Sequence, residues 1–434
     1  MAWGAGNYTT MNKILPGVYT NVKSKGEIRG VGADRGVVGI GIKGLTWGPE
    51  GAFKLTASEF YEDAEKYFGV NAMSDGLKGI RDIFAYAHTG YFYRLAGEVV
   101  KATSGLGTAK YGGSYGNDIK VIAGVNIDNP SAFDVEVFVG SKQVIVKRGV
   151  ADTDDMPVND LIVWTDGVAF TATTTNLTGG SEGVLDGTSE PIAYTGMMSA
   201  FEAYSEIDAI GCQSTIAGVK TAFVQYINRL VGEKGRTVQG VIFGEDADSE
   251  NIVNVKNGVD LVYWATGAIG GCAVNSSLTG KKYGGEFILS GDYTTAQLEA
   301  GIRNGEFILH KVGSDLVVLK DINSLKTFTA EKGIVMSNNQ VVRAMNKFIS
   351  GVTESFARYD LGSTPNTEAG RGRVWNRVVG IGKELVDIGA FQPFSNGDVK
   401  VQTVEGDATA IRITAIMQPT QAIEKLYINL VLEG

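Results

Sequence analysis

The chain has 434 residues, which is room for about three domains of ~150 residues each. Its 44% hydrophobic and 20% charged residues are ordinary for a globular protein, and its net charge of −9, with both signs interspersed, disfavours a nucleic-acid partner. Two cysteines are too few for a disulfide framework, residues 1–10 lack the apolar core of a secretory signal, and no apolar run is long enough for a bilayer. We therefore expect no membrane insertion and a protein that is made and kept in a reducing cytoplasm.

The first predicted segment, residues 1–25, is an N-terminal arm without a core element. It carries one short extended stretch that contains Leu15, Val18 and Tyr19. The proline in this stretch has no amide donor, so the stretch suits an edge strand or a strand added to another sheet.

Residues 26–96 are predicted to be an α/β segment of the core. An apolar strand at 37–42 comes first. Thr56 and Glu59 then form a capping box, which predicts the start of a helix. A second helix follows, and an aromatic strand at 91–95 ends the segment.

Residues 97–187 change character, and short strands dominate them. We expect strands at 118–125, 133–139, 143–147 and 161–165. In the second of these, apolar residues alternate with acidic ones, as in a half-buried antiparallel strand. Turn-rich segments separate the strands, a Thr- and Gly-rich run follows at 171–187, and the whole segment is predicted to be a small inserted all-β domain.

Residues 188–333 return to an α/β pattern, which predicts a core domain with a partly parallel sheet and covering helices. Helical patterning covers 197–204 and 216–230. Strands are expected at 208–211, 238–243 and 260–265. Thr294 and Gln297 predict a further capped helix, and a hairpin is expected around Gly313.

Residues 334–434 are predicted to be a C-terminal α+β domain. Ser337 and Gln340 are expected to cap a long helix, and a second helix follows it. Three extended runs come last, at 399–404, 411–417 and 426–432. The whole chain is thus expected to be an α+β or α/β multidomain protein, with a mixed sheet flanked by helices, the inserted all-β domain, and extended strand arms at both ends.

A search for catalytic chemistry finds no convincing site. His88 and His310 are far apart in the chain, and the glycine-rich stretches 30–36 and 267–271 lack the spacing of a dinucleotide or phosphate loop. Four aspartates, at 152, 154, 155 and 160, could chelate calcium, but they lack the glycine and glutamate of an EF-hand, so a solvated loop is favoured. We predict no catalytic residue, no cofactor and no metal site.

The two extended ends favour assembly instead. A terminal strand with few flanking residues can pair within its own chain or be donated to a neighbouring sheet. Both outcomes stay open on composition alone. The predicted residues for pairing between subunits are Leu15, Val18, Tyr19, Leu426, Tyr427, Ile428, Leu430 and Leu432.

Four stretches resemble the contractile tail sheath family of phages and phage-like tailocins. They are a PGVY sequence at 16–19, an aromatic and small-residue stretch at 263–279 that ends in N-x-S-x-T, the sequence DINSLKTFT at 321–329, and YINL at 427–430. The third is the most specific, although Lys326 departs from the family pattern.

The resemblance implies a structural subunit rather than an enzyme. Such subunits form hexameric rings that stack helically around a tail tube, exchange terminal strands, and contract to drive the tube through a bacterial envelope without consuming nucleotide. The implied partners are copies of the chain itself, the tail tube protein, and the baseplate and tail terminator proteins. The implied location is the virion tail, assembled in the host bacterial cytoplasm.

The resemblance also suggests a surface for the tube. Arg371, Arg373, Arg377 and Lys383 lie along one predicted helix and would form a basic edge for an acidic tube; a merely solvated helix face is the alternative. Two other functions remain open. The helix–strand alternation and glycine loops allow a cytosolic nucleotide-binding α/β enzyme, and the strand-like ends allow a static capsid or surface-layer protein.

Overall fold

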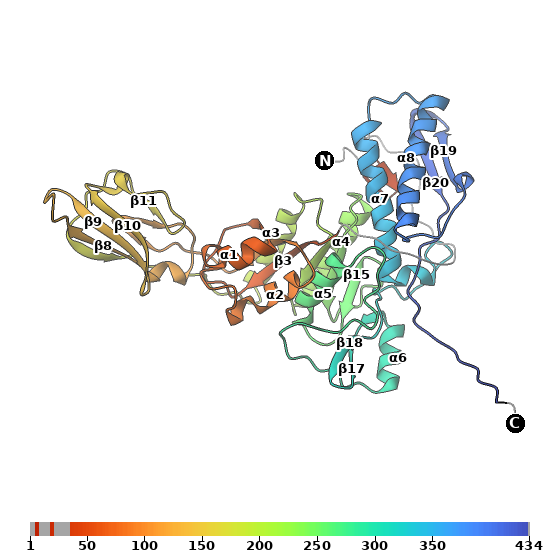
Figure 1. The fold of residues 1–434 in the computed structure, drawn as a ribbon, viewed down its shortest axis with the longest axis horizontal. Helices are drawn as coiled ribbons and strands as arrows, with labels where there is room; N and C mark the ends of the chain where they lie inside the picture. Colours follow the sequence, from red (N-terminus) through yellow and green to blue (C-terminus); the bar gives the residue numbers. More distant parts are fainter. Residues whose placement is uncertain (1–4, 8–17, 21–34, 433–434) are drawn as a thin grey trace. The chain divides into compact units, whose positions relative to one another are not determined.

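The computed structural model describes residues 5–7, 18–20 and 35–432. The chain divides into two compact units (Figure 1). The first consists of Met1–Gly39, Asp82–Thr89 and Tyr204–Gly434, and the second of Ile40–Arg81 and Gly90–Ala203. Helices and mixed sheets occur together, which confirms the predicted α+β multidomain class.

The first unit is built on parallel strands in the order β16-β15-β14-β13, each pairing in parallel with its neighbour. Their bounds are β13 Ala209–Cys212, β14 Gln239–Phe243, β15 Ile252–Val255 and β16 Glu306–Phe307. Nearly all of their residues are buried, as expected for parallel strands covered on both faces. The helices α4 Ala217–Gly232 and α5 Leu261–Gly271 pack against β14.

The strand predicted at 260–265 is wrong, because these residues begin helix α5. A short apolar run cannot be assigned by periodicity when the element is buried all round. The glycine-rich stretch 267–271 is the end of this helix and allows close packing: a Cβ at Gly267 would lie 2.5 Å from the carbonyl oxygen of Ile83. This buried helix end has the role of packing rather than of a phosphate loop.

Two smaller elements complete this part of the first unit. Thr294 and Gln297 form the predicted capping box of α6 Thr295–Arg303. The predicted hairpin is β17 Leu309–Val312 with β18 Asp315–Val318, and its turn needs Gly313, whose φ is +62°.

The C-terminal part of the first unit contains α7 Asn339–Tyr359, α8 Glu368–Asp387 and the antiparallel pair β19 Val399–Val404 and β20 Asp407–Ala415. Helix α8 packs on α7 and on β19, around a core that includes Val374 and Val378. Asn338 caps α7 by accepting from the Gln340 amide, so the predicted cap at Ser337 is one residue too early. The third extended run, 426–432, forms no strand with the described residues.

The N-terminal strands of the first unit are β1 Ala5–Asn7 and β2 Val18–Thr20, which pair in parallel. Val18 and Tyr19 lie in β2, opposite Ala5 and Gly6. Leu15 lies outside the described residues.

The second unit has a mixed α/β part and an all-β part. The mixed part contains β3 Val37–Lys43, β4 Ala52–Thr56, β5 Thr89–Leu95, α1 Ala57–Phe68, α2 Lys78–Phe84 and α3 Ser189–Phe201. Helix α1 begins at the predicted Thr56–Glu59 capping box and ends at Gly69, which has the left-handed φ of +70°. The capping box and the C-terminal glycine act between residues a few positions apart, so the sequence alone predicts both ends of this helix.

The all-β part confirms the predicted small all-β domain, and its strands form a sandwich of two sheets (Figure 1). One sheet has the order β10-β9-β8-β12 and the other β11-β7-β6. Their bounds are β6 Thr103–Ser104, β7 Gly107–Ala109, β8 Ile119–Val125, β9 Phe133–Val139, β10 Lys142–Val150, β11 Ile162–Trp164 and β12 Thr173–Asn176. Strand β12 falls in the Thr- and Gly-rich run, where the sequence pattern predicts no strand.

Candidate assembly site

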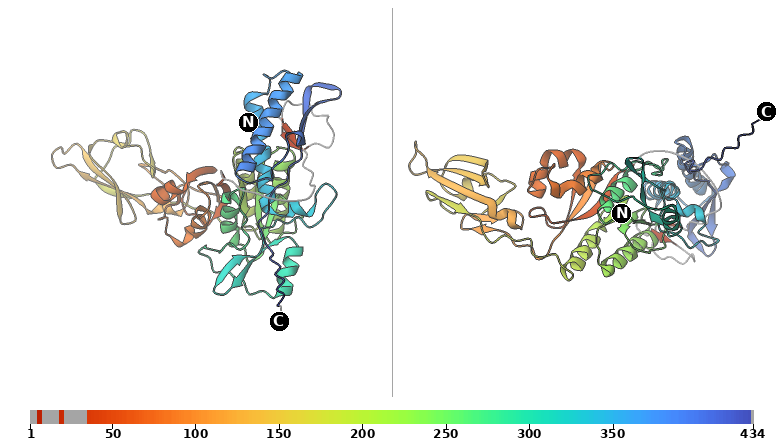
Figure 2. Two further views of the ribbon diagram at one scale, coloured as in Figure 1. Left: turned by 45° about the vertical axis from the view of Figure 1, so that its right-hand side comes forward. Right: turned by 90° about the horizontal axis from the view of Figure 1, so that it is seen from below.

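The residues after β20 first run along the first unit, with Thr420 buried, and then leave it as an exposed extension (Figure 2). We call residues 416–424 the root and residues 425–432 the arm. The arm has no helix or strand in the described chain, and its large apolar side chains are nearly fully exposed: Leu426 80%, Tyr427 87%, Ile428 80%, Leu430 76%, Val431 74% and Leu432 85%. Such a contiguous apolar surface marks a site of interaction with another protein surface.

The root, in contrast, is held along its length. The Ile416 amide donates to the Asp398 carbonyl oxygen at 2.9 Å, the Gln418 carbonyl oxygen accepts from the Gln392 amide at 2.8 Å, and the buried Thr420 donates its hydroxyl to the Gly389 carbonyl oxygen at 3.2 Å. Two further polar attachments lie at its C-terminal end. The Ala422 amide donates to Gln340 Oε1 at 3.0 Å. The Glu424 carboxylate lies 3.0 Å from Lys320 Nζ and accepts from Thr279 Oγ1 at 3.2 Å. The described residues beyond Glu424 make no hydrogen bond or ion pair with the described chain, so the arm begins where the polar bonds end.

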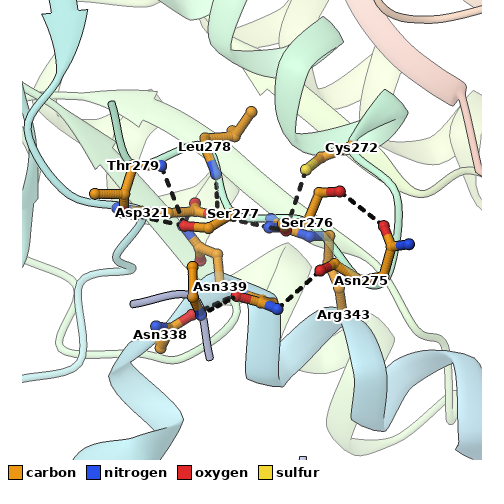
Figure 3. Close-up of polar contacts among 12 residues, drawn as sticks. Cys272, Asn275, Ser276, Ser277, Leu278, Thr279, Asp321, Asn338, Asn339 and Arg343 are labelled. Carbon is orange, nitrogen blue, oxygen red and sulfur yellow. Dashed lines mark hydrogen bonds and ion pairs between the residues drawn. The ribbon is translucent and has the colours of Figure 1, made fainter. Parts of the chain in front are cut away.

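Thr279, which bonds Glu424 of the root, belongs to a buried polar cluster (Figure 3). Asp321 and Arg343 are both fully buried and form an ion pair at 2.5 Å. The Asp321 carboxylate also accepts from the side-chain amide of Asn339 at 2.9 Å and from the Leu278 amide at 3.0 Å. The Asp321 amide donates to Thr279 Oγ1 at 3.0 Å, so one hydroxyl links the cluster to Glu424.

Two of the four stretches that resemble the tail sheath family meet in this cluster. Asn275–Thr279 lies in the N-x-S-x-T stretch, Asp321 opens the DINSLKTFT stretch, and Arg343 follows on α7. Arg343 Nη2 also donates to the Ser276 carbonyl oxygen at 2.8 Å. Gln340, predicted only as a capping partner, instead bridges Asn275 and Ala422, since its Nε2 donates to the Asn275 carbonyl oxygen at 3.0 Å.

The electrostatics of the cluster favour charged arginine. Burial is the largest single effect and lowers the pKa of Arg343, but the charge of Asp321, the nearby Cys272 and the hydrogen bond to Asp321 together outweigh it, so the pKa lies above its ordinary value. For Arg35, burial is the largest effect and lowers the pKa, although Asp208 lies 3.5 Å from its Nε and opposes the shift. Burial also raises the pKa of the Cys272 thiol, which therefore stays protonated at neutral pH.

The predicted basic row on α8 is divided between two roles. Arg377 pairs with the buried Asp360, and Arg371 donates to the side-chain oxygen of Asn366 at 3.0 Å, so these two hold the domain together. Arg373 and Lys383 are exposed on the helix.

The other candidate residues serve local structure. The aspartates at 152, 154 and 155 accept from nearby backbone amides, and Asp160 pairs with Lys66 and Lys110. His88 Nδ1 bonds the Thr89 hydroxyl at 2.8 Å. In the part of the chain that the structure describes, no group of three or more potential ligands is arranged to hold a metal ion, and no helix is long and apolar enough to cross a membrane.

Comparison with known proteins identifies the family of the chain. Three family models match consecutive stretches: the phage tail sheath protein beta-sandwich domain at 96–182, the phage tail sheath protein central domain at 187–324, and the phage tail sheath C-terminal domain at 331–433. The phage-like element PBSX protein XkdK of Bacillus subtilis (strain 168) is 29% identical over 98% of this chain and 98% of its own length.

Solved structures give the same result. The sheath tail protein DSY3957 of Desulfitobacterium hafniense has a TM-score of 0.78 at 29% identity, covering 95% of this chain and 99% of that one. A chain from the anti-feeding prophage helical sheath in its contracted state shares the fold, with a TM-score of 0.56 at 10% identity over 97% of this chain and all of that one.

The chain belongs to the phage tail sheath family. It is a structural subunit of a contractile tail sheath, a virion tail component that assembles with copies of itself. The comparisons support neither the nucleotide-binding enzyme nor the static capsid or surface-layer protein. The sandwich and the C-terminal α+β part described above thus correspond to named sheath domains.

Proposed function

We propose that the subunits form rings stacked around a tail tube and that each subunit donates its arm to a sheet of a neighbour. The exposed apolar arm, with no partner among the described residues, is the observation that carries this proposal. Contraction then follows from two alternative packings of the same subunits, whose difference in contact free energy supplies the work. The baseplate, tail tube and tail terminator proteins are the further partners, and assembly takes place in the host bacterial cytoplasm.

The β19–β20 pair is the best acceptor for the donated arm. Within the described chain it is a sheet of two strands only, so each strand has one open edge. An isolated pair of strands is marginally stable, and its inner face already packs on α8 through Val399 and Val401. An added strand would extend this sheet by backbone hydrogen bonds. Leu426, Ile428, Leu430 and Leu432 would then face one side of the sheet, and Tyr427 and Val431 the other.

The expected free energy of binding is small for one donated arm and becomes large only in a polymer of many subunits. Burying the apolar side chains of the arm would contribute roughly 1.5–3 kcal/mol for each large one. Ordering the backbone costs about 1–2 kcal/mol per residue, which offsets most of that gain. A single donated arm is therefore weak, whereas many arms in a stacked polymer act together through high effective concentration.

Truncation after Glu424 tests the donated arm while keeping the root contacts. We expect a folded, monomeric protein that forms no tubes in negative-stain electron microscopy. Ile428→Ser should weaken assembly, whereas Asn429→Ser, which removes no apolar group from the neighbouring position, should leave it intact. Normal tubes from the truncated protein would refute arm donation.

The exposed residues Arg373 and Lys383 are our proposal for the surface that faces the tube. Reversing both charges, R373E/K383E, should leave the fold intact and abolish co-assembly with an acidic tube protein. Lys147→Glu, an exposed change in the second unit, is the control for reversing a surface charge away from α8. Unchanged co-sedimentation of the double variant with tubes would reject this surface.

A further inference from the structure

We infer that the polar cluster bonded to the root is an anchor that fixes the point and direction at which the arm leaves its own subunit. Gln340, Thr279 and Lys320 are its positioning residues, and Glu424 is the residue that they hold. The inference rests on the proposed donation of the arm and adds to it a part of the molecule that prepares the donation.

The anchor is built from three chain segments that are distant in sequence. Gln340 is buried, and its side-chain amide is used on both sides: Nε2 donates to Asn275 and Oε1 accepts from Ala422. Because both groups of this buried amide are engaged, the amide cannot rotate without breaking a bond to the root or to the 275–279 stretch. The main chain at Ala422 is thereby held in one orientation.

Glu424 provides the second point. Its side chain is one-fifth exposed and lies between Lys320 Nζ and Thr279 Oγ1. Thr279 is itself fixed because its hydroxyl oxygen accepts from the Asp321 amide, next to the ion pair with Arg343. The ion pair between Asp321 and Arg343 therefore restricts the position of the Thr279 hydroxyl, which in turn holds the Glu424 carboxylate.

Ile423 separates the two held positions, yet its side chain is 75% exposed. The segment from Ala422 to Glu424 is thus attached by directional polar bonds and not by apolar burial, whereas Met417, near the start of the root, packs against the core beside α8. Bonds of this kind set a direction without covering the apolar arm that follows.

Two consequences follow for donation. Residues 425–432 can span at most about 27 Å at ~3.4 Å per residue, so the anchor limits the acceptor to a near neighbour. Release of residues 421–424 would add about 14 Å of reach and four more residues to order at each donation. Holding the root in advance removes that ordering cost, which is the general advantage of preorganisation.

A nitroxide at Ile423→Cys measures the anchor directly by electron paramagnetic resonance, because Cys212 and Cys272 are buried and will not take the label. At a concentration without polymer, we expect a slow label in the parent protein and a fast label in Glu424→Ala and in Gln340→Met. Glu354→Ala removes an exposed carboxylate on α7 that forms no ion pair within the described residues, and this variant should leave the label slow. Equal mobility in all four proteins would overturn the anchor.

Assembly is the second measurement. We expect Glu424→Ala to raise the protein concentration needed for tubes by about two- to fivefold, the factor of one partly exposed ion pair, with an unchanged melting temperature. A faster label with an unchanged assembly threshold would show that the anchor plays no part in donation, which overturns the inference. Tubes from the protein truncated after Glu424 would instead refute arm donation itself, whatever the label reports.

Discussion

Replacing Asp321 by asparagine tests whether the buried ion pair is structurally required. The change keeps the size of the side chain and removes its charge. Arg343 is then left charged and fully buried, and an amide NH2 group must face one of three donors, which are Arg343, Asn339 and the Leu278 amide. Breaking a buried pair from one side costs about 3–5 kcal/mol, so we expect a loss of that size in the free energy of unfolding.

The assay is urea denaturation followed by circular dichroism, together with hydrogen exchange of the peptide that contains Leu278. The matched control is Glu299→Gln, which breaks an exposed pair with Arg303 at 2.7 Å and should cost under about 0.5 kcal/mol. The double variant D321N/R343M should be less destabilised than the sum of the single variants, since no unpaired charge remains.

A cost for Asp321→Asn no greater than that of Glu299→Gln would refute the reasoning. So would exchange at the Leu278 amide that does not change, because this amide donates to the altered carboxylate. Either result would mean that the cluster tolerates an uncompensated arginine.

Two further predictions concern the second unit. Thr56→Ala removes the hydroxyl that caps α1 and should lower the free energy of unfolding by about 1 kcal/mol in denaturant melts. The hydrogen bond from the Thr56 backbone, followed by that from its side chain, lowers the pKa of Glu59; the stabilisation is therefore present above the ordinary pKa and is lost as the pH falls through the lower folded value, which NMR titration can follow. Gly113→Ala should cost about 3 kcal/mol or more, since φ is +127° and a Cβ would overlap the Thr46 carbonyl oxygen, whereas Gly124→Ala, with open space around it, should not destabilise. Equal melting of the two alanine variants would contradict this.

Local patterns predicted much of the fold. The capping boxes at Thr56 and Thr294 mark the starts of α1 and α6, and the alternation in 133–139 gives β9 with its observed bounds. These signals act between residues a few positions apart. Elements whose identity depends on their surroundings were missed, as with α5 and with the threonine-rich β12, which is a strand because β8 pairs with it.

The same division applies to the candidate site. The arm could be predicted from the sequence because its apolar residues lie close together in the run 426–432. The root contacts were not visible, because Ala422 meets Gln340 and Glu424 meets Thr279 only through the tertiary fold. Similarity of the 275–279 and 321–329 stretches to the sheath family indicated that they matter, but not that they lie together.

The anchor also explains why an arm would be donated instead of folding back. After β20 ends at Ala415, the chain is bonded at Ala422 and Glu424 to segments outside the β19–β20 pair, and Figures 1 and 2 show it running away from that pair. The apolar arm is therefore directed away from the open edges of its own subunit, which are the acceptors nearest in sequence. If residues 422–424 were held by apolar packing, burial of the arm on its own subunit would compete with donation. Because these residues are held by polar bonds and Ile423 is exposed, the free energy of burying the apolar arm is gained on a neighbouring subunit, which favours polymer over monomer.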